Sequence, residues 1–497
     1  MFYLNKNIKG RMHRICAFIS LIVLSVSATL YAQVPVLVRD INPGQSSSSP
    51  QELTEFAGKL YFGTSKVNGL WMTDGTDLGT VQTDGGSSII GNDYVSQLTV
   101  FNRQLFFNTD LNPSWWSTAG GIDNAIEITD NFNFLKGVSY DSTALAETDL
   151  VFAGLDFNIS GSAINLYCSN GNMLDAIGNF ESDSNGPRPK GFKTVNSQLI
   201  FSAVERNTGR ELYSTDATTG TTFLIKDINP GKANSLSDKN GLDEGIVLGN
   251  ELCFPALSNE PSGSKLWCTD GTTGGTFALY DEEGVKNGTQ ADYDSPHNLT
   301  VYNNFINFFA NVRGSKHAQL FRVSTTWRDP TIPIHPTQIT FDDGRSAKGG
   351  TINGGIIGAN NKCDSDMKPM VVDDNLYFPR EDSNNGCELW KSDGTTDGTE
   401  ILKDINPGGE GSVPVLLAGF NGELYFAATK EGYGKELWHT NGKASGTQLV
   451  SDLNPGSKGS IVNDSMLEYN GELYYVADDG IHGQELYKIS FPAKNQK

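Results

Sequence analysis

Basic residues are scarce in this sequence of 497 residues, which has 37 Lys and Arg against 58 Asp and Glu and a formal charge of −21. Residues 1–32 hold four of the basic residues, Lys6, Lys9, Arg11 and Arg14, and no acid. Without them the balance is 33 minus 58, or −25. A nucleic-acid binder needs a basic surface that neutralises phosphates, and binding to anionic lipid has the same need. The charge therefore predicts no nucleic-acid partner.

Several metal and nucleophile motifs are also missing. The sequence contains no Cys-x-x-Cys, no His-Glu-x-x-His and no Gly-x-Ser-x-Gly. A zinc knuckle, a zincin-type metal site and a nucleophile-elbow hydrolase are therefore not indicated. No histidine occurs between His13 and His297. This gap is only weak evidence against catalysis, because propeller sites assemble from residues scattered along the chain.

Long apolar runs are absent after residue 32. Residues 1–32 have a basic start and an apolar run from Ile15 to Ala32, directly before Gln33. This order is typical of a secretory signal peptide, with an uncleaved membrane anchor as the alternative. We expect residues 33–497 to be the mature chain, secreted to the extracellular space or the periplasm and without a membrane span.

Cysteine is rare, with five residues after position 32. Export permits disulfides. Cys253 and Cys268 lie on two strands of one predicted hairpin, so we predict that they pair. Cys363 with Cys387 is the second predicted pair, which leaves Cys168 unpaired.

Glycine is abundant, with 55 residues, and one short strand motif recurs along the chain. The motif is a polar residue, a variable position and an apolar or aromatic triplet, and its middle residues are Leu60, Leu105, Leu150, Leu199, Leu252, Ile306, Leu376, Leu424 and Leu473. Seven of the steps are 45 to 54 residues, and the step of 70 contains an expected exposed insertion loop over 342–370. A period of this size, without helical periodicity, indicates β-propeller blades.

Each repeat contains four strand candidates, which the eighth shows over 415–419, 424–427, 436–439 and 447–450. Asn421-Gly422 between the first two is a strong hairpin signal. The ninth repeat stops at Ile489 without a fourth strand, and a matching segment, Val36 to Gly44, stands at the other end of the chain. We predict an all-β fold, a single closed β-propeller of about eight or nine four-stranded blades closed by the N-terminal strand, with two smaller propellers as the alternative.

The repeat resembles that of the ELWxxDGT family of exported bacterial proteins. Glu388 to Thr399, followed by Leu402 to Gly408, matches the family pattern nearly throughout. Further copies lie at Leu70 to Thr80, Glu211 to Gly231, Leu266 to Thr276 and Glu436 to Gly456. The resemblance covers about 450 residues and implies a propeller on an exported protein, but little biochemistry.

The repeated motifs favour structural roles. The Asp-Gly-Thr turns at Asp74, Asp270 and Asp393 are similar to Asp-box hairpins, in which the aspartate accepts backbone N–H groups. Trp71, Trp267, Trp390 and Trp438 precede the turns at a fixed offset, which favours packing between blades. The Asp-x-Asn-Pro-Gly segments begin at Asp40, Asp227, Asp404 and Asp452 and look like fragments of a calcium loop, so these aspartates are candidate ligands of structural calcium.

A ligand is expected on the loops between the second and third strand of each blade, which differ most between repeats. The candidates on these loops are Trp115, Trp116, Arg206, Arg210, Arg313, His317, Arg380, Tyr433 and His482. Aromatic rings stack on sugars, and arginine pairs with uronate or sulfate. The alternative is that these are ordinary solvated loops of a polar protein.

The sequence favours a binding or adhesion module whose partner is an extracellular polysaccharide or a cell-surface protein. The alternative is a propeller-fold polysaccharide lyase or glycoside hydrolase acting on an anionic polysaccharide. A scaffold role is a third hypothesis. No residue pattern assigns a catalytic group, so the sequence leans away from an enzyme without deciding the question.

Overall fold

The recurring strand motif folds into four-stranded antiparallel sheets in the computed structural model of the chain. The structure describes residues 33–67, 69–83, 94–101, 103–109, 115–122, 125–127, 144–146, 149–156, 163–169, 174–177, 187–216, 221–238, 242–259, 262–280, 292–312, 318–326, 336–340, 363, 368–382 and 384–491. The predicted signal peptide (residues 1–32) lies outside these residues, and so does the predicted insertion loop (342–370) apart from Cys363 and residues 368–370.

The described residues form nine sheets, which we number in chain order. Sheets one to three are β2–β5 (Pro50–Phe56, Lys59–Thr64, Leu70–Thr73, Val81–Gln82), β6–β9 (Val95–Phe101, Gln104–Thr109, Trp115–Thr118, Ala125–Glu127) and β10–β13 (Ala144–Ala146, Asp149–Asp156, Ala163–Ser169, Leu174–Ile177). Sheets four to six are β14–β17 (Lys190–Val195, Gln198–Glu205, Gly209–Asp216, Thr221–Lys226), β18–β21 (Ile246–Leu248, Glu251–Asn259, Ser262–Thr269, Phe277–Ala278) and β22–β25 (Tyr293–Tyr302, Phe305–Val312, Gln319–Ser324, Thr337–Gln338). Sheets seven and eight are β26–β29 (Met370–Val372, Asn375–Asp382, Gly386–Ser392, Glu400–Lys403) and β30–β33 (Val415–Phe420, Glu423–Lys430, Gly434–Thr440, Gln448–Ser451), with the short 3₁₀ turn η1 (Ala444–Gly446) before β33. Sheet nine combines β34–β36 (Ile461–Tyr469, Glu472–Asp478, Gln484–Ile489) with β1 (Pro35–Arg39).

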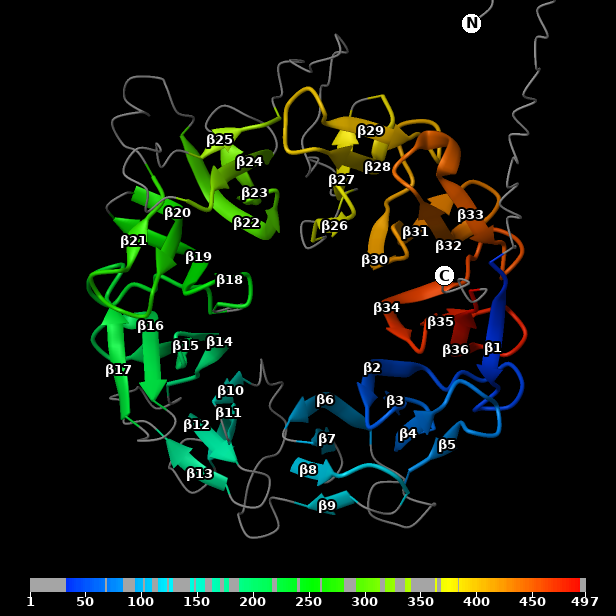
Figure 1. The fold of residues 1–497 in the computed structure, drawn as a ribbon, viewed down its shortest axis with the longest axis horizontal. Coiled ribbons are helices and arrows are strands. Elements are labelled where there is room, and N and C mark those ends of the chain that lie inside the picture. Colours follow the sequence, from blue (N-terminus) through cyan, green and yellow to red (C-terminus); the bar gives the residue numbers. More distant parts are fainter. Residues whose placement is uncertain are drawn as a thin grey trace, which may run out of the picture. The chain divides into compact units, whose positions relative to one another are not determined.

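The N-terminal strand completes the last sheet, as the sequence predicts. β1 pairs antiparallel with β36, with Pro35 opposite Ile489 and Leu37 opposite Tyr487 (Figure 1). The strand order of sheet nine is therefore β1-β36-β35-β34, whereas strands of the other sheets follow one another in chain order. Residues more than 400 positions apart are thus joined by backbone hydrogen bonds.

The Asn421-Gly422 turn shows how the sequence sets the strand register. Both residues have positive φ, 52° and 80°, as a tight two-residue hairpin requires. The turn places Gly419 of β30 opposite Leu424 of β31. Leu424 is one of the recurring motif residues, and it is fully buried. The motif therefore marks the second strand of a sheet, whose side chains pack on both faces.

The core lies between successive sheets. Phe254 and Trp267 of sheet five pack with Leu212 and Ile225 of sheet four, and other neighbouring sheets share similar clusters. The first strands of successive sheets touch, as β22 and β26 or β26 and β30 do, and β34 of the last sheet touches β2 of the first. A four-stranded sheet with two apolar faces is stabilised by such stacking.

Both predicted disulfides are confirmed. Cys253 and Cys268 stand directly opposite each other on β19 and β20, and Cys363 is joined to Cys387 of β28. Cys168 lies on β12, but its side chain is outside the described residues. In the portion that the structure describes, we find no helix with the length and apolar character needed to cross a membrane.

Candidate functional site

The sheets have two chemically different ends. In an antiparallel sheet of four strands, the turns after the first and third strand lie at one end, which we call the turn end. The loop between the second and third strand and the link to the next sheet lie at the other, which we call the loop end. At the loop end, Glu431 N of a second-to-third-strand loop donates to Asn406 Oδ1 of the preceding link at 3.0 Å.

The turn end is locked by the repeated Asp-Gly-Thr motif. Asp393 Oδ1 accepts hydrogen bonds from Thr395 N (2.9 Å) and Thr395 Oγ1 (2.6 Å), and Ser392 Oγ lies 2.7 Å from Thr399 Oγ1. The turns at Asp74 and Asp270 repeat this geometry. These aspartates are occupied in holding the turn, which agrees with the structural role predicted for the motif.

The motif tryptophans join neighbouring sheets. Lys226, at the end of β17, lies over the Trp267 ring of the next sheet with Nζ 5.7 Å from the ring centre, and it donates to Thr276 O at 2.7 Å. Lys403 repeats this contact with Trp438 and Thr447. The predicted packing of these rings between blades is therefore observed: Trp267, Trp390 and Trp438 are buried, and Trp71 is half-buried.

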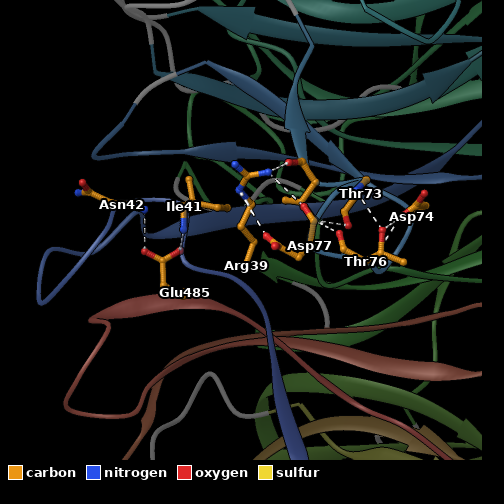
Figure 2. Close-up of polar contacts among 10 residues, drawn as sticks. Arg39, Ile41, Asn42, Thr73, Asp74, Thr76, Asp77 and Glu485 are labelled. Atoms are coloured by element: carbon orange, nitrogen blue, oxygen red, sulfur yellow. Dashed lines mark hydrogen bonds and ion pairs between the residues drawn. The ribbon is translucent and has the colours of Figure 1, made fainter.

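The loop end contains a recurring buried glutamate to which the sequence analysis assigned no role. Glu211, Glu388, Glu436 and Glu485, the first residues of the Glu-Leu-Trp or Glu-Leu-Tyr steps, are fully buried. Figure 2 shows Glu485 accepting from the backbone N–H groups of Ile41 (3.2 Å) and Asn42 (3.4 Å), which follow Asp40 in the link. Each glutamate thus binds the backbone of an Asp-x-Asn-Pro-Gly link.

A serine completes each of these contacts. The hydroxyl groups donate to the carboxylates at 2.6 Å for Ser235 and Glu211 and at 2.5 Å for Ser412 and Glu388. Ser460 with Glu436 and Ser48 with Glu485 repeat the pair at 2.5 Å. The glutamate, the link and the serine form one unit, which occurs four times in the described part of the chain and fixes the links at the loop end.

Burial changes the protonation of these glutamates. Desolvation raises the pKa of Glu211 and of Glu388 to about 7, although the hydrogen bonds from serine and backbone oppose it. Desolvation also raises the pKa of Glu436 and Glu485. The loop end therefore holds two carboxyl groups, those of Glu211 and Glu388, whose pKa lies close to neutral pH.

One sequence signal could have revealed this unit. The Asp-x-Asn-Pro-Gly link appears only where the glutamate is present. In sheet five, Lys265, opposite Ala256, stands where sheets four and seven to nine have the glutamate, and its Nζ donates to Tyr293 O at 2.5 Å. In sheet six, Gln319 stands at the glutamate position, and its side-chain oxygen accepts from Thr340 Oγ1. Neither sheet is followed by such a link.

The candidate calcium ligands Asp40, Asp227, Asp404 and Asp452 begin the links. Asp40 Oδ2 accepts from Gly44 N at 3.2 Å, which closes the turn. The asparagine two residues later also closes the link, as Asn406 Nδ2 does by donating to Gly411 O at 2.8 Å. No group of three or more His, Cys, Asp or Glu side chains able to hold a metal occurs in the described part of the chain.

Three predicted ligand residues are buried, and their expected exposure on loops was wrong. Trp116 of β8 is 5 % exposed and packs between sheets one and two. Arg210 of β16 is 1 % exposed, with Nε 3.0 Å from Asp238 Oδ1 and Nη1 2.8 Å from Arg188 O. Arg380 of β27 is fully buried and lies over the Trp390 ring at 4.8 Å. The strands extend through these positions, so the side chains point into the packing between strands and sheets.

Three other candidates remain at the loop end. Arg206 is exposed in the turn between β15 and β16. Tyr433 is half-buried between β31 and β32, and Lys430 Nζ lies 5.0 Å from its ring centre. His482 precedes β36. The side chains of Trp115, Arg313 and His317 lie outside the described residues.

His482 is held by a carboxylate. Its Nδ1 lies 2.7 Å from Asp479 Oδ2, and this hydrogen bond raises the pKa of His482. Burial alone raises the pKa of Asp479, but hydrogen bonds from the His482 backbone and ring and from Ile481 N outweigh it and lower the pKa to about 2. The pair therefore keeps its ionic form, with His482 positively charged, over a wider pH range than a free histidine.

Comparisons with known proteins give similar structures only. No family model and no curated protein matches the chain. Similar solved structures include a prolyl endopeptidase (TM-score 0.40, 11 % identity, covering 87 % of this chain and 54 % of that one). A puromycin-hydrolysing peptidase of Mycobacterium tuberculosis (0.37, 9 %, 72 % and 53 %) and a puromycin hydrolase (0.35, 9 %, 77 % and 58 %) are also similar. The matched regions span about half the length of those proteins.

Proposed function

We propose that residues 33–497 are secreted and form a single closed β-propeller that binds an extracellular polysaccharide or cell-surface protein through its loop end. The pairing of β1 with β36 and the contact between β34 and β2 support closure. The two disulfides support export, because such bonds persist in oxidising compartments. The resemblance to the ELWxxDGT repeat is part of the same proposal.

The observation that carries the binding role is the contrast between the two ends of the sheets. At the turn end, the same Asp-Gly-Thr hydrogen bonds recur and occupy the polar side chains. At the loop end, the links are fixed by buried glutamates, while the loops between second and third strands differ from sheet to sheet. Variable loops on a rigid base are the usual arrangement of a recognition surface.

The side chains on these loops suit an anionic or hydroxyl-rich ligand. Tyr433 offers an aromatic ring beside the Lys430 ammonium group. His482, whose pKa is raised by its hydrogen bond to Asp479, lies on the corresponding loop of the next sheet, and Arg206 is exposed in sheet four. Rings stack on sugar faces, and cations pair with uronate or sulfate groups.

The test is a binding assay with matched variants. Purified residues 33–497 are titrated with neutral, uronic-acid and sulfated polysaccharides, and the double variant Tyr433→Ala/His482→Ala is compared with the turn-end double variant Leu78→Ala/Lys443→Ala. Both control residues are exposed, Leu78 at 89 %. We expect the loop-end variant to lose about 1.4 kcal/mol or more of binding free energy, which raises the Kd about tenfold or more. The control variant is expected to bind as the wild type does.

Two outcomes contradict the proposal. Equal loss of binding in both double variants would show that the loop end is not the recognition surface. Polysaccharide chains shortened during incubation, as read by mass spectrometry, would replace the binding role with catalysis. An unsaturated sugar at the new end would identify a lyase, and its absence a hydrolase.

A further inference from the structure

Buried carboxylate oxygens without partners recur in the links of the loop end. Asp452 Oδ1 and Glu436 Oε1 are both buried and have no hydrogen-bond partner. The two groups are close, because Glu436 Oε2 accepts from Leu453 N, directly after Asp452 in the chain. The negative charge of Asp452 adds to desolvation in raising the pKa of Glu436. Two buried acceptors that repel each other need a proton, a water or a cation between them.

The same pattern appears in the link after sheet four. Asp227 Oδ1 and Asn229 Oδ1 are buried without hydrogen-bond partners, and Asn229 is only 3 % exposed. Glu211 accepts from Ile228 N at 2.8 Å and from Asn229 N at 3.4 Å, so its carboxylate lies against the same two residues. The amide oxygen of Asn229 accepts but cannot donate, so this copy too needs a carboxyl proton, a water or a cation beside its oxygens.

We propose that these links hold calcium ions, one bound by Asp452 with Glu436 and one by Asp227 with Asn229 and Glu211. Carboxylate and amide oxygens are ligands of Ca²⁺, and backbone carbonyl groups and water complete its shell. The described residues place no cationic side chain in an ion pair with Asp227, Asp452, Glu211 or Glu436. The ion would offset the charge of a buried glutamate and a half-buried aspartate and tie each link to its strand. This inference does not depend on the proposed ligand of the loop end.

The experiment measures calcium binding and thermal stability on the purified mature chain after EDTA treatment. Isothermal titration with CaCl₂ is expected to give two sites with Kd of about 10⁻⁴–10⁻³ M, the range of extracellular calcium modules. A few millimolar CaCl₂ is expected to raise the melting midpoint by about 2–4 °C. Asp452→Asn and Asp227→Asn are each expected to remove one site, and the double variant both.

Asp464→Asn is the matched control, because Asp464 is an exposed carboxylate near the same link, with its Oδ1 3.5 Å from Lys435 Nζ. It is expected to keep two sites. The proposal is overturned if calcium gives neither heat nor a shift in the wild type, or if the Asp452→Asn/Asp227→Asn variant still binds two ions. A water or proton at these positions would instead make Asp452→Asn more stable than the wild type at pH 7.5, with no response to calcium.

Discussion

Replacing Glu388 by alanine tests whether the buried glutamates hold the links. Glu388 is fully buried and accepts from Asn406 N (3.0 Å) and Ser412 Oγ (2.5 Å). The Glu388→Ala variant leaves the buried Ser412 hydroxyl and the partly buried Asn406 N–H without an acceptor. The first costs roughly 1–3 kcal/mol and the second about 1 kcal/mol. We therefore expect the free energy of unfolding to fall by about 2–4 kcal/mol at pH 5.5.

The free energy of unfolding that Glu388→Ala removes should become smaller as the pH rises. The pKa of Glu388 is about 7 in the folded protein against 4.5 unfolded, so its protonated form is favoured by folding. Its contribution to stability is complete below pH 4.5 and decreases as the pH rises through 7. A difference of about 2.5 pKa units corresponds to about 3 kcal/mol. At pH 5.5 about one of these units is already lost, and the remaining 1.5 or so, about 2 kcal/mol, are lost by pH 8.5. The effect of Glu388→Ala should therefore be about 2 kcal/mol smaller at pH 8.5 than at pH 5.5.

Urea denaturation of the wild type and the variant at pH 5.5 and pH 8.5 measures both free energies of unfolding. Glu400→Ala is the control: Glu400 lies in the same sheet, partly exposed, with Oε1 3.4 Å from Lys391 Nζ, and its loss should cost no more than about 1 kcal/mol. An effect of Glu388→Ala no larger than the control would refute the reasoning. An effect that grows with pH would refute it too, because it would mean that the fold favours the ionised carboxylate.

Three further variants test the other contacts. Asp393→Ala removes the acceptor of the Asp-Gly-Thr turn and should cost about 1–2 kcal/mol in urea denaturation; no change would remove the structural role of the motif. Replacing Cys253 and Cys268 together by serine opens a loop of sequence separation 15 and should cost about 3 kcal/mol, so a melting midpoint within 1–2 °C of the wild type would contradict it. Lys403→Met removes the ammonium group over the Trp438 ring together with its hydrogen bond to Thr447 O, with an expected cost of about 0.5–1.5 kcal/mol; a more stable variant would show that the charge is unfavourable there.

Much of the fold could be predicted from the sequence because its signals are local. The Asn421-Gly422 pair fixes a hairpin through backbone conformation alone. The motif leucines mark buried second strands, and the missing strand after Ile489 has its match at Val36. Cys253 and Cys268 face each other because the hairpin register sets their pairing.

The candidate site was harder to predict because exposure depends on where strands end. Arg210 and Arg380 appeared to belong to loops, but β16 and β27 include both positions and bury them. Pro379, directly before Arg380, pairs with Leu389 inside the ladder. Glu388 binds a link 18 residues later in the chain. Such a contact leaves no local pattern, and only comparison between repeats reveals it.

The central claim is that residues 33–497 form one closed propeller on which the loop end is a single surface. Small-angle X-ray scattering on the purified mature chain tests it most directly. We predict a single compact particle with a radius of gyration of roughly 23 Å, the value for a globular domain of this length. A clearly larger radius, with a distance distribution showing two separate maxima, would indicate an open array or two smaller propellers and would contradict the account.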